Sequence, residues 1–373
     1  MTYLNLVLSG LFSLSLLTAQ TDSSNAKELH RNFAFTFITP LGTNGMDSWR
    51  TVNKVSINLF AGAARGVEGI EVGGFANVTL KNMNGAQGAG FVNAVLGNVK
   101  GSQMAGFANY CGGDTKGAAF AGFANANLGN LHGGQFAGFC NYNQKNAKGF
   151  QGSGFANVNL GDIKGGQVAG FANVAKNVDG LQASGFINCA KKVKGAQIGF
   201  LNIADSVDGA SIGFLSIVRH GLHQLEVSSD ELFYTNLSIR TGGHGFYNIV
   251  TTGFSPKDGT TLWHVGYGVG TSFKMNERFR SDITLSAQHV SKGLFCYGTS
   301  ELYKLYIGAE YKLSKKCHIA AGPTFNVYFG DTYLQDFGTK YSNVAPYSLL
   351  DETNSSGFNF KAWVGGKIAI RFF

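Results

Sequence analysis

The stretch GGQVAGFANVAKNVDG, from Gly165 to Gly180, decides the fold because close copies of it recur along the chain. One earlier copy, GSQMAGFANYCGGDTKG, spans Gly101 to Gly117. The shared pattern is Gly-x-Gln-x-x-Gly-Phe-x-Asn. A pattern that returns at a nearly fixed spacing indicates stacked structural units, with one unit for each copy.

The Gly-Phe pairs measure the period of this repeat. Successive pairs lie sixteen residues apart six times, and the last three steps are fifteen, fourteen and fourteen residues. The ten phenylalanines are Phe75, Phe91, Phe107, Phe123, Phe139, Phe155, Phe171, Phe186, Phe200 and Phe214. An Asn follows each of the first nine by two residues, at Asn77, Asn93, Asn109, Asn125, Asn141, Asn157, Asn173, Asn188 and Asn202. We interpret both sets as structural ladders and not as catalytic residues.

Three architectures accommodate such a repeat: a β-solenoid with one coil per copy, a stack of hairpins, and a membrane barrel with one strand per copy. The barrel has a difficulty, because alternate strands run in opposite directions and both ends would carry the same connecting sequence. A solenoid has no such conflict, so we favour it. In a solenoid we expect the Phe rings to form an internal ladder and the Asn and Gln amides to bond in rows along the axis.

The composition agrees with an all-β protein. The chain of 373 residues contains 53 glycines, 31 phenylalanines and 14 tyrosines but only four prolines. The glycines do not recur at every third position, which excludes collagen, and the aromatic residues supply the apolar area that a disordered linker lacks. The net charge is +8, yet only 14% of residues are charged and no long basic run occurs. We therefore expect no nucleic-acid partner.

The chain before the repeats divides into two parts. The first, MTYLNLVLSGLFSLSLLTAQ, is apolar from Leu4 to Leu17 and has a small residue at Ala19, so residues 1–19 are predicted to be a secretory signal peptide. Residues 20–64 are predicted to contain two strands, near 32–40 and 51–62. The repeat region itself is assigned to 65–221. The five cysteines, Cys111, Cys140, Cys189, Cys296 and Cys317, form neither a zinc pattern nor a disulfide framework.

After the repeats, residues 222–373 alternate between apolar and polar side chains. From Tyr303 to Leu313, for example, aromatic and aliphatic residues alternate with a set that includes Lys304, Tyr306 and Glu310. This period of two predicts antiparallel strands of a small barrel or closed sheet. The predicted strands are 232–241, 245–254, 261–274, 279–291, 302–314, 317–329 and 358–373. A soluble sandwich or a barrel filled with side chains is the alternative to a membrane barrel.

The chemistry-bearing motifs are weak. His220, His223 and Glu226 are spaced for a metal on one helix face, but they follow the last repeat, where we expect a polar turn that caps the stack. The glycine-rich run Gly266–Gly270 precedes no helix, so it predicts no dinucleotide site. We therefore predict no catalytic, cofactor-binding or metal-binding residue, and no enzyme.

Residues 195–242 resemble bacterial surface-repeat proteins of spirochaetes and Bacteroidetes, whose repeats read Gly-x-Gln-x-Gly-x-x-Asn. The matching positions are Gly195, Gln197, Gly199 and Asn202. The earlier copies carry one more residue between Gln and Gly-Phe. The resemblance implies an exported protein of the cell envelope and supplies no activity.

Together these features predict an exported envelope protein, in the outer membrane or at the surface of a Gram-negative-type bacterium, with a structural or binding role. A small outer-membrane pore or transporter is the alternative. A row of stacked Asn and Gln side chains offers a contact surface for polysaccharide or protein, unless the amides bond to one another inside the stack.

Overall fold

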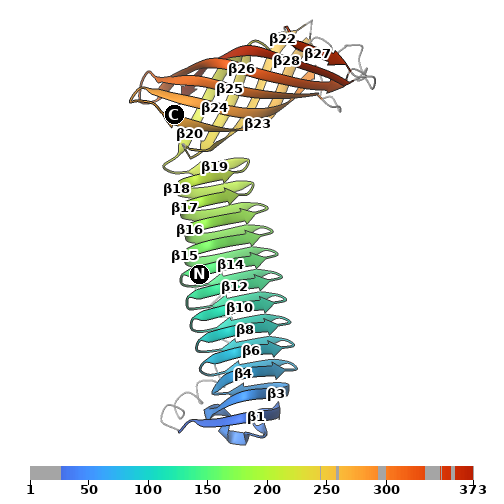
Figure 1. Ribbon diagram of the computed structural model, residues 1–373, viewed down its shortest axis with the longest axis vertical. Coiled ribbons are helices and arrows are strands. Elements are labelled where there is room, and N and C mark those ends of the chain that lie inside the picture. The colour runs from blue at the N-terminus through green and yellow to red at the C-terminus, as the bar shows by residue number, and fades with distance from the viewer. Residues whose placement is uncertain are drawn as a thin grey trace. The chain divides into compact units, whose positions relative to one another are not determined.

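The computed structural model describes residues 27–243, 245–257, 260–292, 300–331, 345, 347–353 and 358–372. The chain divides into two compact units, one ending at Gly185 and one beginning at Phe186 (Figure 1). The predicted signal peptide at 1–19, Cys296 and the final Phe373 lie outside the described residues.

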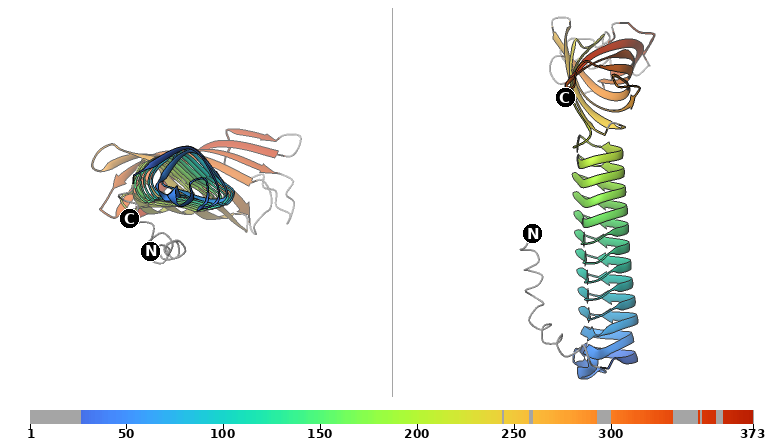
Figure 2. Two further views of the ribbon diagram at one scale, coloured as in Figure 1. Left: turned by 90° about the horizontal axis from the view of Figure 1, so that it is seen from below. Right: turned by 90° about the vertical axis from the view of Figure 1, so that its left-hand side faces the viewer.

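The repeats form a parallel β-solenoid of about ten turns, as predicted, and neither a hairpin stack nor a barrel wall. A typical coil consists of β8 (Val99–Ala105) and β9 (Ala108–Cys111), joined by a bend at the Gly-Phe pair. The next coil lies in register, so that β8 pairs in parallel with β10 (Thr115–Ala121) and Gly101 lies opposite Gly117. The left view of Figure 2 shows the coils superposed along their axis.

The remaining elements of the first unit repeat this arrangement. They are β1 (Leu29–Ile38), β2 (Leu41–Gly42), the 3-10 helix η1 (Gly45–Arg50), β3 (Thr51–Ala64), β4 (Gly66–Gly73), β5 (Ala76–Thr79), β6 (Met83–Ala89), β7 (Val92–Val95), β11 (Ala124–Asn127), β12 (Leu131–Ala137), β13 (Cys140–Asn143), β14 (Ala147–Ser153), β15 (Ala156–Ala169) and β16 (Ala172–Ser184). The second unit continues with β17 (Ile187–Ile198), β18 (Leu201–Ile212) and β19 (Leu215–Val218).

The first Gly of each copy is required by the backbone. Gly117 has a φ of +139°, a conformation that side chains with a Cβ rarely adopt. A Cβ at this position would lie 1.8 Å from the carbonyl oxygen of Gly101 in the preceding coil. This Gly therefore allows two coils to approach to the strand spacing at a sharp turn.

The strands predicted near 32–40 and 51–62 exist as β1 and β3, but they belong to the solenoid. β1 pairs in parallel with β3, and β3 pairs in parallel with β4 and β5. They are not part of the barrel sheet. β2 folds back antiparallel onto β1, which caps the first coil as solenoid ends require.

Residues 222–372 form a closed antiparallel barrel of eight strands. Its strands are β20 (Leu222–Asp230), β21 (Thr235–Gly242), β22 (Tyr247–Lys257), β23 (Thr260–Lys274), β24 (Phe279–Lys292), β25 (Ser300–Lys312), β26 (Cys317–Asp331) and β28 (Phe358–Phe372), with the short β27 (Leu350–Thr353) beside β28. β28 pairs with β20 and closes the ring. The seven predicted strands match seven of these. The strand β20 was not predicted, because a capping turn was expected there, and β27 was not predicted either.

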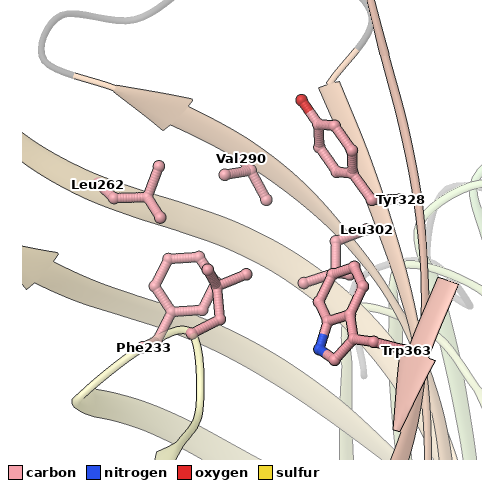
Figure 3. Close-up of a cluster of buried hydrophobic side chains, with 7 residues drawn as sticks. Phe233, Leu262, Val290, Leu302, Tyr328 and Trp363 are labelled. Atoms are coloured by element: carbon pink, nitrogen blue, oxygen red, sulfur yellow. The ribbon is translucent and has the colours of Figure 1, made fainter. Parts of the chain in front are cut away.

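A cluster of apolar side chains fills the barrel interior near one end (Figure 3). Phe233 comes from the connection between β20 and β21, and it packs with Leu262, Leu302 and Trp363 from the barrel wall. The neighbouring Glu231 accepts a hydrogen bond from Trp363 Nε1 at 2.8 Å. The β20–β21 connection therefore folds inward and occupies the interior.

Candidate functional site

The interior of the solenoid is a ladder of asparagine amides. Along the ladder, an Asn donates one hydrogen bond to the amide oxygen of the Asn in the next coil, for example from Asn109 to Asn125 at 2.9 Å. Its second proton goes to a backbone carbonyl of that coil, here Phe120 at 2.7 Å. Asn77, Asn141 and Asn157 are fully buried. The Asn positions predicted as a structural ladder therefore form one, with its hydrogen bonds made inside.

A second interior ladder is made by the glutamines. Gln103 donates to Gln87 at 3.0 Å, and Gln167 donates to Gln151 at 2.9 Å. This ladder donates toward the N-terminal coils, whereas the Asn ladder donates toward the C-terminal coils. The amide side chains therefore make their hydrogen bonds within the stack. They do not offer the flat polar contact surface that was one interpretation of the sequence.

The ten phenylalanines of the repeat lie outside the solenoid, and the prediction of an internal Phe ladder is wrong. Phe107 is 40% exposed, and its ring stacks on Phe91 at 4.7 Å and on Phe123 at 4.9 Å. The bend at Gly106 and Phe107 is the cause, because it turns the chain at a corner and points the Phe side chain outward. The stacked rings form what we call the Phe ladder: Phe60, Phe75, Phe91, Phe107, Phe123, Phe139, Phe155 and Phe171 in the first unit, and Phe186, Phe200 and Phe214 in the second.

A second row of mostly apolar residues runs beside the Phe ladder in the first unit, three residues before each of the first-unit rings. Strand pairing aligns its members in adjacent coils. This outer row consists of Ile57, Val72, Gly88, Met104, Phe120, Phe136, Gly152 and Val168. An open groove of about 620 Å³ follows the row from Gly88 to Ser153, and alanines and glycines form much of its lining. No charged side chain lines this groove.

A basic row lies on the same face of the same strands, four residues before the outer row. It consists of Lys100, Lys116, His132, Lys148 and Lys164, which are aligned by strand pairing and exposed. Within the described part of the chain, none of the four lysines forms an ion pair. Like charges at the strand spacing of about 4.8 Å repel one another, so the row favours an anionic partner.

In the second unit, the last coil carries serines at the ladder positions and is bonded to the barrel. Asn248 of β22 donates to the Ser216 hydroxyl and to the Ser211 carbonyl, each at 2.7 Å. Tyr267 donates to Asn248 at 2.6 Å. An open depression beside these contacts is lined by Phe214 together with Leu237, Ile239 and Val265 from the barrel exterior. The last ring of the Phe ladder is therefore continuous with the apolar outer wall of the barrel.

The barrel interior holds a network of charged side chains from several strands. Arg371 of β28 bonds to Glu226 at 2.7 Å, to Asp282 at 2.6 Å and to Glu310 at 2.5 Å. Arg240 bonds to Asp282 at 2.8 Å and stacks on the Tyr247 ring. Three cations, Arg240, Lys367 and Arg371, face three carboxylates, Glu226, Asp282 and Glu310. The network is balanced in charge and crosses the lumen.

The barrel exterior is apolar, in contrast to the charged interior. Leu225, Ile239, Leu285 and Ile368 point outward, and each is 44% exposed or more. The alternation predicted for the last strand holds, since Ile368 and Ile370 are exposed while Arg371 is buried. Among the described residues, no helix is long and apolar enough to span a membrane.

The three residues considered as a metal site are separated. His220 precedes β20, whereas His223 and Glu226 lie within it, where a spacing of three residues places side chains on opposite faces. His223 contacts the Val218 carbonyl at 2.7 Å, whereas Glu226 binds Arg371 inside the barrel. In the described ranges, no three His, Cys, Asp or Glu side chains are grouped to hold a metal ion.

The cysteine thiols are structural side chains. Cys111 is buried, while Cys140, Cys189 and Cys317 are half-buried, and none of these four described cysteines forms a disulfide. Burial raises the pKa of the Cys111 thiol, which disfavours the reactive thiolate.

Sequence analysis did not identify the buried charge network. The signal was present in β25, where Lys304, Tyr306 and Glu310 share the polar face, and in Arg371 near the end of the chain. Period-two alternation cannot show which residues of distant strands meet across a closed barrel.

Comparison of the chain with protein-family models, with curated proteins and with solved structures found no match.

Proposed function

We propose that this protein is an exported envelope protein whose barrel spans the outer membrane and anchors the solenoid, which serves as a binding surface. The observation that carries the proposal is the inverted barrel, with aliphatic side chains such as Leu285 outside and Arg371 fully buried inside. A transmembrane barrel has this arrangement because hydrocarbon surrounds it. Strands such as β24, with fourteen residues, exceed the 9–11 residues that suffice for a tilted crossing.

The filled interior favours an anchor over a pore. Arg371 and Arg240 link opposite walls of the barrel through Asp282. The apolar cluster around Phe233 occupies the interior near one end. A conducting pore needs a water-filled lumen, so we expect the intact protein to conduct little or no current in planar bilayers.

The strand connections support an orientation. The connections 243–246, 275–278 and 313–316 are short and lie at the barrel end where β20 begins and β28 ends. The long connection 332–357 joins strands at the opposite end. Outer-membrane barrels carry short turns on the periplasmic side and long loops outside. The chain before Leu222 therefore enters the barrel from the periplasmic side, which favours a periplasmic over a surface-exposed solenoid.

Fractionation of a Gram-negative host that produces the full chain tests the proposal. We expect the protein in the outer membrane, resistant to carbonate extraction, and with a gel mobility that changes on boiling. Protease added to intact cells should spare the solenoid, and protease added after permeabilisation should reach it. A full chain that is soluble and monodisperse without detergent would contradict the membrane anchor. Cleavage of the solenoid on intact cells would contradict the orientation alone.

A substitution on the outer wall gives a quantitative test. Leu285→Lys should destabilise the barrel in bilayers by about 2–4 kcal/mol, the cost of Lys near the midplane. Ile70→Lys changes a side chain of equal exposure on the solenoid, 54% in both cases, and should change stability by less than about 0.5 kcal/mol. Denaturant titration in phospholipid vesicles measures both. Equal effects would mean that water surrounds both side chains.

A further inference from the structure

We propose that the solenoid binds anionic phospholipid, with acyl chains along the groove beside the Phe ladder and the phosphate at the basic row. This inference rests on the proposed membrane anchor and names the ligand class of the solenoid. Its basis is the presence of two features on the same strands of the first unit: an uncharged apolar groove and a row of exposed basic side chains.

The groove has the form that an extended hydrocarbon chain requires. It follows five coils, from Gly88 to Ser153, so it is about 19 Å long at the strand spacing. Its apolar side chains are Met104, Phe120 and Phe136, while alanines and glycines keep the floor low. A groove that lacks charged groups and runs straight along the axis fits a linear apolar ligand. It offers no hydrogen-bonding side chain except Ser153 to orient a sugar or a peptide.

The basic row supplies the second half of an amphipathic ligand. Lys116 precedes Phe120 by four residues in β10, and both side chains are exposed. Lys100 and Lys148 stand in the same relation to Met104 and Gly152. A ligand with an anionic head and apolar tails matches this spacing. A zwitterionic or neutral lipid would leave the repulsion among the lysines uncompensated.

Exposed aromatic rows of this length also need an explanation in their own right. Phe75, Phe107 and Phe139 are each about 40% exposed, and the outer row adds Met104 at 51% and Phe120 at 44%. Contiguous apolar surface of this extent marks a binding site for a partner or a lipid. A second copy of the chain would bury the Phe rows equally well, but it would place two basic rows in one interface.

Site-specific photocrosslinking in cells tests the inference on the full chain. Phe120 is replaced by benzoylphenylalanine in cells grown with radioactive phosphate, and Gln144, an exposed residue at a turn beyond β13, receives the same replacement as control. We expect radioactive phosphate on the protein after irradiation only with the label at position 120. Phospholipase C should release it, because that enzyme cleaves phospholipid headgroups.

Charge reversal supplies the matched variants. Lys116→Glu with Lys148→Glu should abolish the phosphate adduct. Lys145→Glu with Lys176→Glu makes the same change in net charge at exposed positions outside the basic row and should leave the adduct intact. The heat-modified gel mobility of each variant reports whether the barrel has folded.

Three results overturn the lipid assignment: no phosphate adduct in a protein whose barrel is folded, a crosslink to protein including a second copy, or an adduct that resists phospholipase C. The last would identify a phosphorylated glycolipid as the source of the acyl chains. Absence of the chain from the membrane fraction is a different failure, since it removes the proposed anchor itself.

Discussion

The solenoid and the barrel both place polar side chains inside and apolar ones outside, but they satisfy the interior in different ways. In the solenoid the interior is neutral, and the same amide bond recurs, as from Asn125 to Asn141 and from Asn141 to Asn157. In the barrel the interior is ionic and unique, since Arg371 alone bonds to three carboxylates. Repetition distributes the polar interactions over many equivalent bonds, whereas the barrel concentrates them in a few residues. The two regions should therefore respond differently to loss of one side chain.

The largest effect is expected in the barrel. Arg371→Met removes the cation that Glu226, Asp282 and Glu310 share, and leaves a buried network with one cation fewer than its carboxylates require. Breaking a buried ion pair in this way costs about 3–5 kcal/mol. Lys316→Met, at an exposed turn, removes the same charge and should have little effect. Denaturant titration of the purified full chain in micelles measures both, and equal stabilities of the two variants would refute a structural role for the network.

A smaller effect is expected in the solenoid. Asn141→Ala removes the acceptor of Asn125 and the donor to Asn157, but the backbone carbonyl partners and the neighbouring rungs remain. Loss of these buried bonds should cost about 1–3 kcal/mol and should be confined to adjacent coils. Hydrogen exchange of the full chain, resolved by coil, measures it. Exposed Asn84→Ala is the control. If protection from hydrogen exchange were lost equally in all coils, the solenoid would unfold as one cooperative unit. The proposed difference between solenoid and barrel would then be wrong.

The smallest effect concerns the one charge in the amide ladders. Glu71 occupies a Gln position and accepts hydrogen bonds from Gln87 at 2.8 Å and Asn58 at 3.0 Å. Burial raises the pKa of Glu71, and these hydrogen bonds offset the rise only in part. Folding therefore favours the protonated acid, so the stability that it contributes is complete below pH 4.5 and is lost as pH rises through the raised pKa.

Glu71→Gln should abolish this loss and slow hydrogen exchange in β4 at pH 8 relative to the parent chain, with a smaller difference at pH 5. Exchange rates at the two pH values, corrected for intrinsic chemistry, provide the measurement. Glu68→Gln changes an exposed carboxyl in the same strand and serves as control. If hydrogen exchange in the Glu71→Gln variant had the same pH dependence as in the parent chain, ionisation of Glu71 would not destabilise the fold.

Much of the fold follows from the sequence because its patterns are local. The spacing of the Gly-Phe pairs predicts the coils, and alternation over ten or more residues predicts seven barrel strands to within a few residues. The side on which a residue lies is harder to predict near a bend. Phe107 follows Gln103 by four residues and precedes Asn109 by two, which suggests a shared inward face, yet the bend at Gly106 directs the ring outward.

The candidate surfaces required the three-dimensional structure for the same reason. The basic row was visible only as single lysines, each sixteen residues from the next in most cases, and strand pairing brings them together. The β20 strand was missed because His220 and His223 resemble a polar cap, and only the closed ring of strands reveals a place for Leu222–Asp230.

The opposed directions of the two amide ladders have a consequence for evolution. Asn side chains donate forward and Gln side chains donate backward, so a coil that carries both residues supplies a donor and an acceptor to each neighbour. The coil with Ala119 at the Gln position interrupts the Gln ladder. The amide dipoles of the two ladders point in opposite directions and partly cancel. Duplication of a sixteen-residue segment that carries both amides leaves the neighbouring rungs paired. Duplication or deletion of one repeat in the gene can thus lengthen or shorten the solenoid in whole steps of about 4.8 Å.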